Sequence, residues 1–162
     1  MKRIEPKAGQ ESLWDYPRPP KLERTNKHLK IVFGGETIAE TNRAYRVLET
    51  SHPPVYYFPP EDVRMDFLTK ASGASFCEWK GSAGYYDLRI GDKTIKNAGW
   101  FYESPTHNFA EIKDYIAFYP SKMDACYVDG EFVQSQAGDF YGGWITSEII
   151  GPFKGGAGTF GW

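Results

Sequence analysis

The stretch HLKIVFGGETIAE, residues 28–40, decides the fold class. Apolar Leu29, Ile31 and Phe33 alternate with polar or smaller residues, which is the period of a strand with one buried face. The pair Gly34–Gly35 separates this run from a second extended run, and two glycines between such runs favour a tight hairpin turn. The stretch therefore predicts an antiparallel β-hairpin.

Two further stretches repeat this pattern. In YYDLRIGDKTIKN, residues 85–97, Gly91–Asp92 lies between two strand-like runs, and in ACYVDGEFV, residues 125–133, Asp129–Gly130 predicts a type I′ turn. The stretch RAYRVLET, residues 43–50, fits a helix or a strand. We favour a strand, because β-branched residues and the prolines that follow disfavour a continuing helix.

One main helix is predicted over about 109–119. Asn108 is a suitable cap with Glu111 three residues later, and Pro120 ends the segment. An apolar stripe at helical spacing joins these signals: Ile112, Tyr115, Ile116 and Tyr119. A shorter helical turn is predicted at Pro60–Asp62. The fold class that we expect is thus mainly β (β-rich α+β).

Composition limits the classes of function. The chain has 162 residues and a net charge of −2, so no basic field favours nucleic acid. No apolar run approaches the ~20 residues of a membrane span, and residues 1–30 lack a signal-peptide core. The two cysteines, Cys77 and Cys126, are too few for a disulfide scaffold. We expect a soluble cytoplasmic protein with reduced thiols.

Two unusual arms flank a core that we place at 28–135. The first arm, 1–27, is rich in proline and carries Leu13, Trp14 and Tyr16. The second arm, 136–162, mixes many glycines with six aromatic residues: Phe140, Tyr141, Trp144, Phe153, Phe160 and Trp162. Docked rings would offset the cost of ordering glycine. The arms either pack on the chain's own core or reach a second subunit in a homodimer.

The motif CEWKG, residues 77–81, raises the question of a reactive thiol. A thiolate nucleophile needs a lowered pKa, and the nearby cation Lys80 is one way to provide it. Two other interpretations of Cys77 are open: it is a small buried apolar residue, or it is part of a pocket wall. His28, His52 and His107 are widely spaced, so we expect no metal site and no cofactor.

Arg46 and Lys80 occur among many aromatic residues: Tyr56, Tyr57, Trp79, Trp100 and Tyr102. Two cations and flat rings suit a pocket for a small organic or anionic ligand. In the alternative interpretation, Arg46 pairs with Glu49 or Asp62 and the rings fill the core. The ligand-binding residues that we predict are Arg46, Tyr57, Cys77, Lys80, Trp100 and Tyr102.

Several motifs occur in an order that resembles a known family. They span about residues 29–133 and include PPVYYFPPEDV, CEWKG, GYYDL, AGWFYESP, YIAFYP and VDGE. The pattern resembles the domain-of-unknown-function 427 family, sometimes labelled nucleotidyltransferase. The resemblance implies a β-tent-like fold, in which a pair of antiparallel sheets leans over a pocket. Arg46, Tyr57, Cys77, Lys80 and Trp100 fall on the family's motif positions.

The resemblance leaves two details open. Many β-tent proteins hold zinc with paired CxxC motifs, and this sequence has none. The arms resemble those of members from photosynthetic lineages, which implies a plastid-stroma-like location as an alternative to the cytoplasm.

The label can be compared with the chemistry of nucleotidyl transfer. That reaction generally needs a glycine-rich turn and two carboxylates for Mg²⁺. Gly81–Ser82 and Asp87 fit this pattern, but Arg89 stands where the second acid would be. We therefore favour a ligand-binding domain. The alternatives are an enzyme, by nucleotidyl transfer or by Cys77 chemistry, and an assembly or regulatory protein that acts through its arms.

Overall fold

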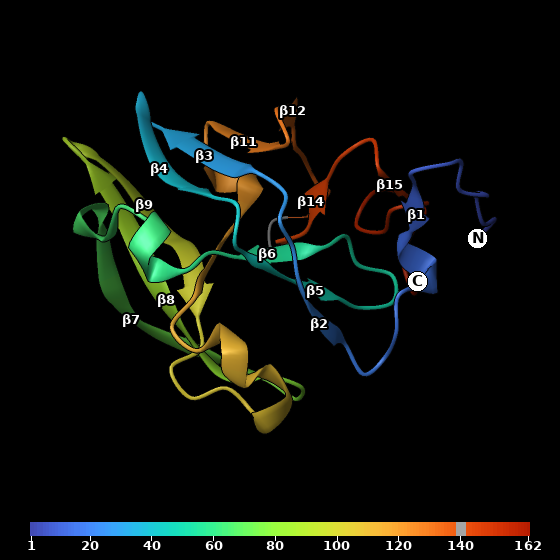
Figure 1. The fold of residues 1–162 in the computed structure, drawn as a ribbon, viewed down its shortest axis with the longest axis horizontal. Coiled ribbons are helices and arrows are strands. Elements are labelled where there is room, and N and C mark those ends of the chain that lie inside the picture. Colours follow the sequence, from blue (N-terminus) through green and yellow to red (C-terminus); the bar gives the residue numbers. More distant parts are fainter. Residues whose placement is uncertain (139–141) are drawn as a thin grey trace.

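The computed structural model describes residues 1–138 and 142–162, so the predicted arm residues Phe140 and Tyr141 lie outside the described residues. The prediction of a mainly β fold is confirmed: most strands form antiparallel sheets, and the helices of the described residues are short 3-10 helices (Figure 1). The two larger sheets each have four strands, in the orders β12-β11-β3-β4 and β10-β9-β8-β7.

The first of these sheets contains the opening hairpin. Strands β3 (Leu29–Phe33) and β4 (Glu36–Thr41) pair antiparallel, and Leu29 and Ile31 are fully buried. β11 (Ala125–Val128) pairs with β3 and with β12 (Glu131–Phe132). Positive φ angles at Asp129 and Gly130, 48° and 82°, fit the predicted type I′ turn. Both hairpin predictions are confirmed.

The second sheet contains the longest strands. β7 (Leu68–Cys77), β8 (Gly81–Ile90) and β9 (Lys93–Phe101) form a meander, and β10 (Ile116–Phe118) pairs with β9. The predicted hairpin at 85–97 is therefore confirmed. Tyr86 and Leu88 face the main core, so alternate residues of β8 face the other side.

A three-stranded sheet joins the second sheet. It has the order β2-β5-β6, with β2 (Lys21–Arg24), β5 (Tyr45–Leu48) and β6 (Val55–Tyr57), which confirms the strand interpretation of 43–50. Just beyond β6, Phe58 and Ile116 exchange two backbone hydrogen bonds of 2.8 and 2.9 Å. These bonds make β6 and β10 neighbours. The helical turn predicted at Pro60–Asp62 is present as η2.

The prediction of one main helix over 109–119 is wrong. A short 3-10 helix, η4 (His107–Ile112), is kinked at Phe109, and Asp114 then has a φ of 64°, which interrupts any helix. Residues Ile116–Phe118 form β10 instead. The backbone of Ile116 is hydrogen-bonded to Phe58, and β10 pairs with β9 on its other side. These tertiary bonds outweigh the local helix signals.

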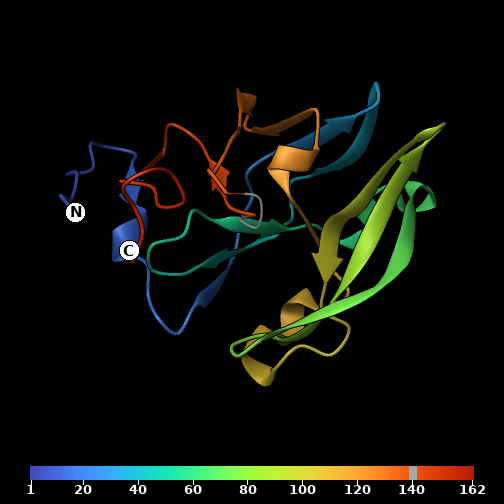
Figure 2. The same ribbon diagram turned by 180° about the vertical axis from the view of Figure 1, so that it is seen from behind.

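The two arms meet at one end of the molecule, where both chain termini lie (Figures 1 and 2). Strand β1 (Glu11–Ser12), which precedes η1 (Leu13–Asp15), runs parallel to β15 (Ile149–Ile150). The indole of Trp14 donates a hydrogen bond to the carbonyl of Pro152, 138 positions away. The C-terminal arm also contains β14 (Trp144–Ile145), which pairs with β13 (Gln134–Ser135).

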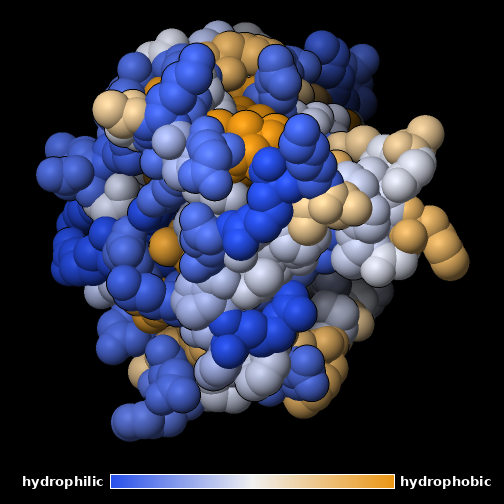
Figure 3. Space-filling model, turned by 90° about the vertical axis from the view of Figure 1, so that its right-hand side faces the viewer, coloured by the Kyte–Doolittle hydropathy of each residue, from blue (hydrophilic) through white to orange (hydrophobic). Residues whose placement is uncertain are grey.

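The remaining short helices, η3 (Met65–Phe67) and η5 (Pro120–Lys122), connect strands. The face on the side of the arms is mostly hydrophilic, with small separate apolar areas (Figure 3). None of the helices within 1–138 and 142–162 has the length and apolar character needed to cross a membrane.

Candidate functional site

A cavity of about 230 Å³ lies where the three-stranded sheet meets the β10-β9-β8-β7 sheet. Its walls come from five strands and from the loops next to them. The lining residues are Val47, Glu49, His52, Pro53, Val55, Tyr57, Ser75, Lys80, Ala83, Tyr85, Trp100, Tyr102 and Tyr119. Six of them are aromatic, counting the imidazole of His52, so flat rings dominate the walls.

The two-residue period of the strands selects which side chains reach the cavity. On β6, Val55 and Tyr57 line it, whereas Tyr56 between them packs against Trp144 in the main core. On β8, Ala83 and Tyr85 line it. The apolar core and the cavity are therefore opposite faces of the same strands.

Phenol and indole groups contact one another around the cavity. Trp100 Nε1 donates a hydrogen bond of 3.2 Å to the hydroxyl of Tyr57, and the Trp100 ring lies 4.6 Å from that of Tyr119. The hydroxyls of Tyr85 and Ser75 are 2.7 Å apart. Burial raises the pKa of Tyr57 and Tyr102 well above the usual value of a phenol. These hydroxyls stay protonated at neutral pH and can donate hydrogen bonds.

His52 is neutral at physiological pH. Burial lowers its pKa, and the nearby positive charges of Lys154 and Arg18 act in the same direction. Its Nδ1 lies 2.9 Å from the carbonyl of Thr50, which only accepts hydrogen bonds, so Nδ1 carries the proton. The Nε2 atom is then an acceptor at the cavity wall.

Lys80 is the cation of the cavity, and only 9% of the residue is exposed. It precedes Gly81, whose φ of 106° favours glycine and completes the turn between β7 and β8. The Lys80 carbonyl accepts a hydrogen bond from Thr106, which fixes the turn on the following loop. The Lys80 ammonium lies 5.9 Å from the ring centre of Tyr102 and 5.8 Å from that of Phe109.

No carboxylate forms an ion pair with Lys80 in the part of the chain that the structure describes. The carboxylate that lines the cavity, Glu49, pairs with Arg18 at 3.1 Å. Within 1–138 and 142–162, Oε1 of Gln136 is the single side-chain polar atom that is both closed off from solvent and without a hydrogen bond. The Lys80 ammonium is not such an atom, so it still reaches solvent.

The structure brings together four of the six predicted ligand-binding residues. Tyr57, Lys80, Trp100 and Tyr102 all line the cavity. Cys77 is half-buried opposite Gly81 and packs against the hydrophobic cluster that contains Tyr57 and Tyr102, but it is not a lining residue. Trp79, which we had grouped with the rings, packs against that cluster as well.

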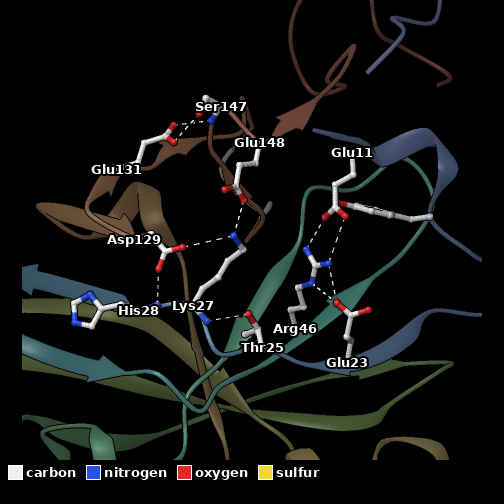
Figure 4. Close-up of polar contacts among 11 residues, drawn as sticks. Glu11, Glu23, Thr25, Lys27, His28, Arg46, Asp129, Glu131, Ser147 and Glu148 are labelled. Atoms are coloured by element: carbon white, nitrogen blue, oxygen red, sulfur yellow. Dashed lines mark hydrogen bonds and ion pairs between the residues drawn. The ribbon is translucent and has the colours of Figure 1, made fainter. Parts of the chain in front are cut away.

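Arg46 lies apart from this cavity. Its neighbour Val47 lines the cavity, so Arg46 points to the opposite face of β5. There it donates hydrogen bonds of 2.6 Å to Glu11 and 2.8 Å to Glu23 (Figure 4). The alternative prediction, pairing with Glu49 or Asp62, is wrong.

Those two carboxylates have other partners. Glu49 pairs with Arg18, and Asp62 pairs with Arg43 at 2.9 Å. Glu11, a true partner of Arg46, lies 35 positions away in the sequence, so no local pattern of the sequence indicates this pair.

A second cation, Lys27, links the C-terminal arm to the rest of the chain. Lys27 lies 2.6 Å from Glu148 of the arm and 3.6 Å from Asp129 (Figure 4). Beside it, Glu131 accepts hydrogen bonds from the backbone and the hydroxyl of Ser147. We call the charged groups around these two cations the arm junction: Glu11, Glu23, Lys27, Arg46, Asp129 and Glu148.

The acids that could serve nucleotidyl transfer, Asp87 and the turn pair Asp129 and Glu131, have structural partners. Asp87 accepts a hydrogen bond from the backbone of Asn97, and Asp129 accepts one from the backbone of His28. Glu131 is occupied by Ser147. Among the described residues, no group of three or more histidines, cysteines and acids is placed to hold a metal ion.

Sequence reasoning missed several lining residues. Tyr85 could have been found from the alternation of the strand, because Tyr86 faces the core and its neighbour must then face the other side. Tyr119 was missed because it was assigned to the helix that is absent. His52 lies in a loop, and no period predicts where a loop side chain points.

Comparison with known proteins gives one finding. A family model described as a domain of unknown function (DUF427) matches residues 21–129, which is about two-thirds of the chain. No curated protein matches the chain.

Proposed function

The chain belongs to the DUF427 family, and we propose that its cavity binds a small organic anion that carries one flat ring. Lys80 contacts the anionic group, and the aromatic walls contact the ring. The observation that carries the proposal is a largely buried lysine at the wall of an aromatic cavity, whose ammonium has no ion-pair partner among the described residues.

Charge supports an anion as the ligand. A buried ammonium without a counter-charge is unfavourable, and a bound carboxylate or phosphate would compensate it. The other charges at the cavity do not do so, because Glu49 is paired with Arg18 and His52 is neutral. The protonated hydroxyls of Tyr57 and Tyr102 are additional donors for anionic oxygens.

Shape supports a single ring. The cavity, about 230 Å³, is smaller than the roughly 300–1,000 Å³ of pockets that hold drug-sized ligands. The rings of Trp100 and Tyr119 are tilted by 48° to each other, and the ring of Tyr57 stands almost perpendicular to that of Trp100, at 89°. Such walls accommodate stacked and edge-on contacts with an aromatic ring.

Thermal unfolding with a panel of defined compounds tests the proposal. Benzoate, 4-hydroxybenzoate and phenyl phosphate should each raise the melting temperature in a concentration-dependent way, since ligands that bind only the folded state stabilise it. Benzyl alcohol has the ring without the charge, and inorganic phosphate has the charge without the ring. Both should give a smaller rise.

The variant Lys80→Met keeps most of the length of the side chain and removes its charge. It should abolish the response to the anions, whereas Lys93→Met, at the exposed first position of β9, should leave it unchanged. Equal responses of wild type and Lys80→Met, or no response of the wild type to any of the ring-bearing anions, would refute the proposal.

A further inference from the structure

We infer that the C-terminal arm completes the ligand site, with Gly142 as the residue that positions Trp100. The inference rests on the proposed function and adds the segment of the chain that sets the shape of the cavity. None of the described residues of the arm lines the cavity; the arm contacts a ring that does.

Gly142 lies directly against the Trp100 ring. A Cβ atom added at Gly142 would lie 2.2 Å from Cη2 of Trp100 and 3.0 Å from Cζ3, far inside van der Waals contact. Gly142 is not among the glycines with positive φ, so backbone freedom does not explain it. The absence of a side chain serves the close approach of the arm to the ring.

The next two residues fix the arm at this place. A Cβ atom at Gly143 would lie 2.8 Å from Cβ of Pro53, which is another lining residue. The backbone N–H of Trp144 donates a hydrogen bond of 2.9 Å to the carbonyl of Pro54, and the Trp144 side chain is 1% exposed. The arm therefore contacts the cavity wall through a well-anchored segment.

Trp100 is held from three directions. Gly142 contacts its six-membered ring, the Tyr119 ring lies 4.6 Å away, and its Nε1 donates to the hydroxyl of Tyr57. A displaced Trp100 would change one wall of the cavity and would also release the hydroxyl of Tyr57. The position of the arm is thus transmitted to two ligand-facing groups.

The variant Gly142→Ala tests the inference with phenyl phosphate as the probe. The added methyl group must displace Trp100, so binding should weaken by about tenfold or more. Gly73→Ala is the matched control, because Gly73 also lies outside the positive-φ group and has open space around it. The control should bind as tightly as the wild type.

A double-mutant cycle separates positioning from general damage. Trp100→Phe lacks the ring atoms that meet Gly142, so Gly142→Ala should cause no further loss in that background. If Gly142→Ala alone does not fold, the double variant should fold again. A double variant that remains unfolded, or one in which the two losses add, would overturn the inference.

The indole ¹H–¹⁵N resonance of Trp100, assigned by its absence in Trp100→Phe, gives a readout that needs no ligand. It should shift in Gly142→Ala and stay in place in Gly73→Ala. Wild-type protein that binds none of the ring-bearing anions would refute the proposed function, while this resonance still decides the role of Gly142. An unmoved resonance would overturn the inference, and so would unchanged binding by Gly142→Ala.

Discussion

The aromatic cavity and the arm junction each hold a largely buried cation, and they compensate it differently. Arg46, whose side chain is 12% exposed, contacts two carboxylates, whereas Lys80 contacts aromatic rings. A cation that is neutralised by carboxylates of the same chain links two segments of the structure. A cation without such a carboxylate is suited to bind an anionic ligand, which would neutralise it.

This difference implies opposite responses to the loss of one positive charge. At the arm junction, removal of the cation takes the shared donor from two partly buried carboxylates, and only Tyr16 remains for Glu11 and Lys21 for Glu23. At the cavity, removal of the cation relieves a charge that the described part of the chain does not neutralise. Stability measurements on charge-removing variants therefore test whether the two cations differ in this way.

The largest expected effect is that of Arg46→Met. The variant should lower the free energy of unfolding by about 2–3 kcal/mol, because Glu11 and Glu23 lose their shared donor. Denaturant unfolding measures the change. Arg64→Met is the control, since Arg64 pairs with Asp66 at the surface, where solvent screens the pair, and its loss should cost much less. Equal losses of unfolding free energy in the two variants would show that Arg46 is no more than a surface charge.

Lys80→Met should have the opposite sign. Without ligand, the variant should be as stable as the wild type or more stable by about 1 kcal/mol, because an uncompensated buried charge is removed. The same denaturant experiment measures this, with Lys93→Met as the exposed control. A clear loss of stability would mean that Lys80 has an internal partner.

Acid should loosen the arm junction and leave the protonation of the cavity phenols unchanged. Burial alone would raise the pKa of Glu11, but hydrogen bonds from Arg46 and Tyr16 outweigh it and hold the pKa below the ordinary 4.5. The stabilising contribution is thus present above pH 4.5 and is lost as the pH falls through the folded-state value.

The size of this acid effect should stay below about 1 kcal/mol, because the Glu11 side chain is 38% exposed and solvent screens it. Unfolding free energies between pH 6 and pH 3.5 measure it, and Glu11→Gln should flatten this part of the profile. An identical profile for the variant would show that Glu11 does not couple the arm to pH. Tyr57 and Tyr102 keep their protons throughout this range.

The smallest effect is expected for Lys27→Met. Its partner Glu148 is 45% exposed, so the loss should be about 0.5 kcal/mol and local to the arm. Hydrogen exchange at residues 147–150 should become faster, with no change in β3. Lys30→Met, which removes a lysine outside the ion pairs of the arm junction, is the control. Faster exchange in both variants would argue against a specific link.

The strands could be predicted because their signals are local. Alternating side chains and the turn pairs Gly34–Gly35, Gly91–Asp92 and Asp129–Gly130 define each hairpin within about a dozen residues. The helix over 109–119 failed because its last part contains a short continuous apolar run, Ile116–Phe118, which also suits a buried strand. Only the distant partner Phe58 and strand β9 decide between the two.

The candidate site was predictable in part for the same reason. Tyr57, Lys80, Trp100 and Tyr102 were grouped from their residue types, and strand geometry brings them together. Arg46 was placed with them because its parity relative to Val47 was not considered. The contact between Gly142 and Trp100 joins positions far apart in the sequence, and no local period contains that information.

The parallel pairing of β1 with β15 sets an order for the folding of a newly made chain. Glu11 and Ser12 leave the ribosome well before their strand partners Ile149 and Ile150 are made. The hairpins of the core, built from near neighbours, can form while synthesis continues. Strand β1 must wait, unpaired, until β15 has been translated.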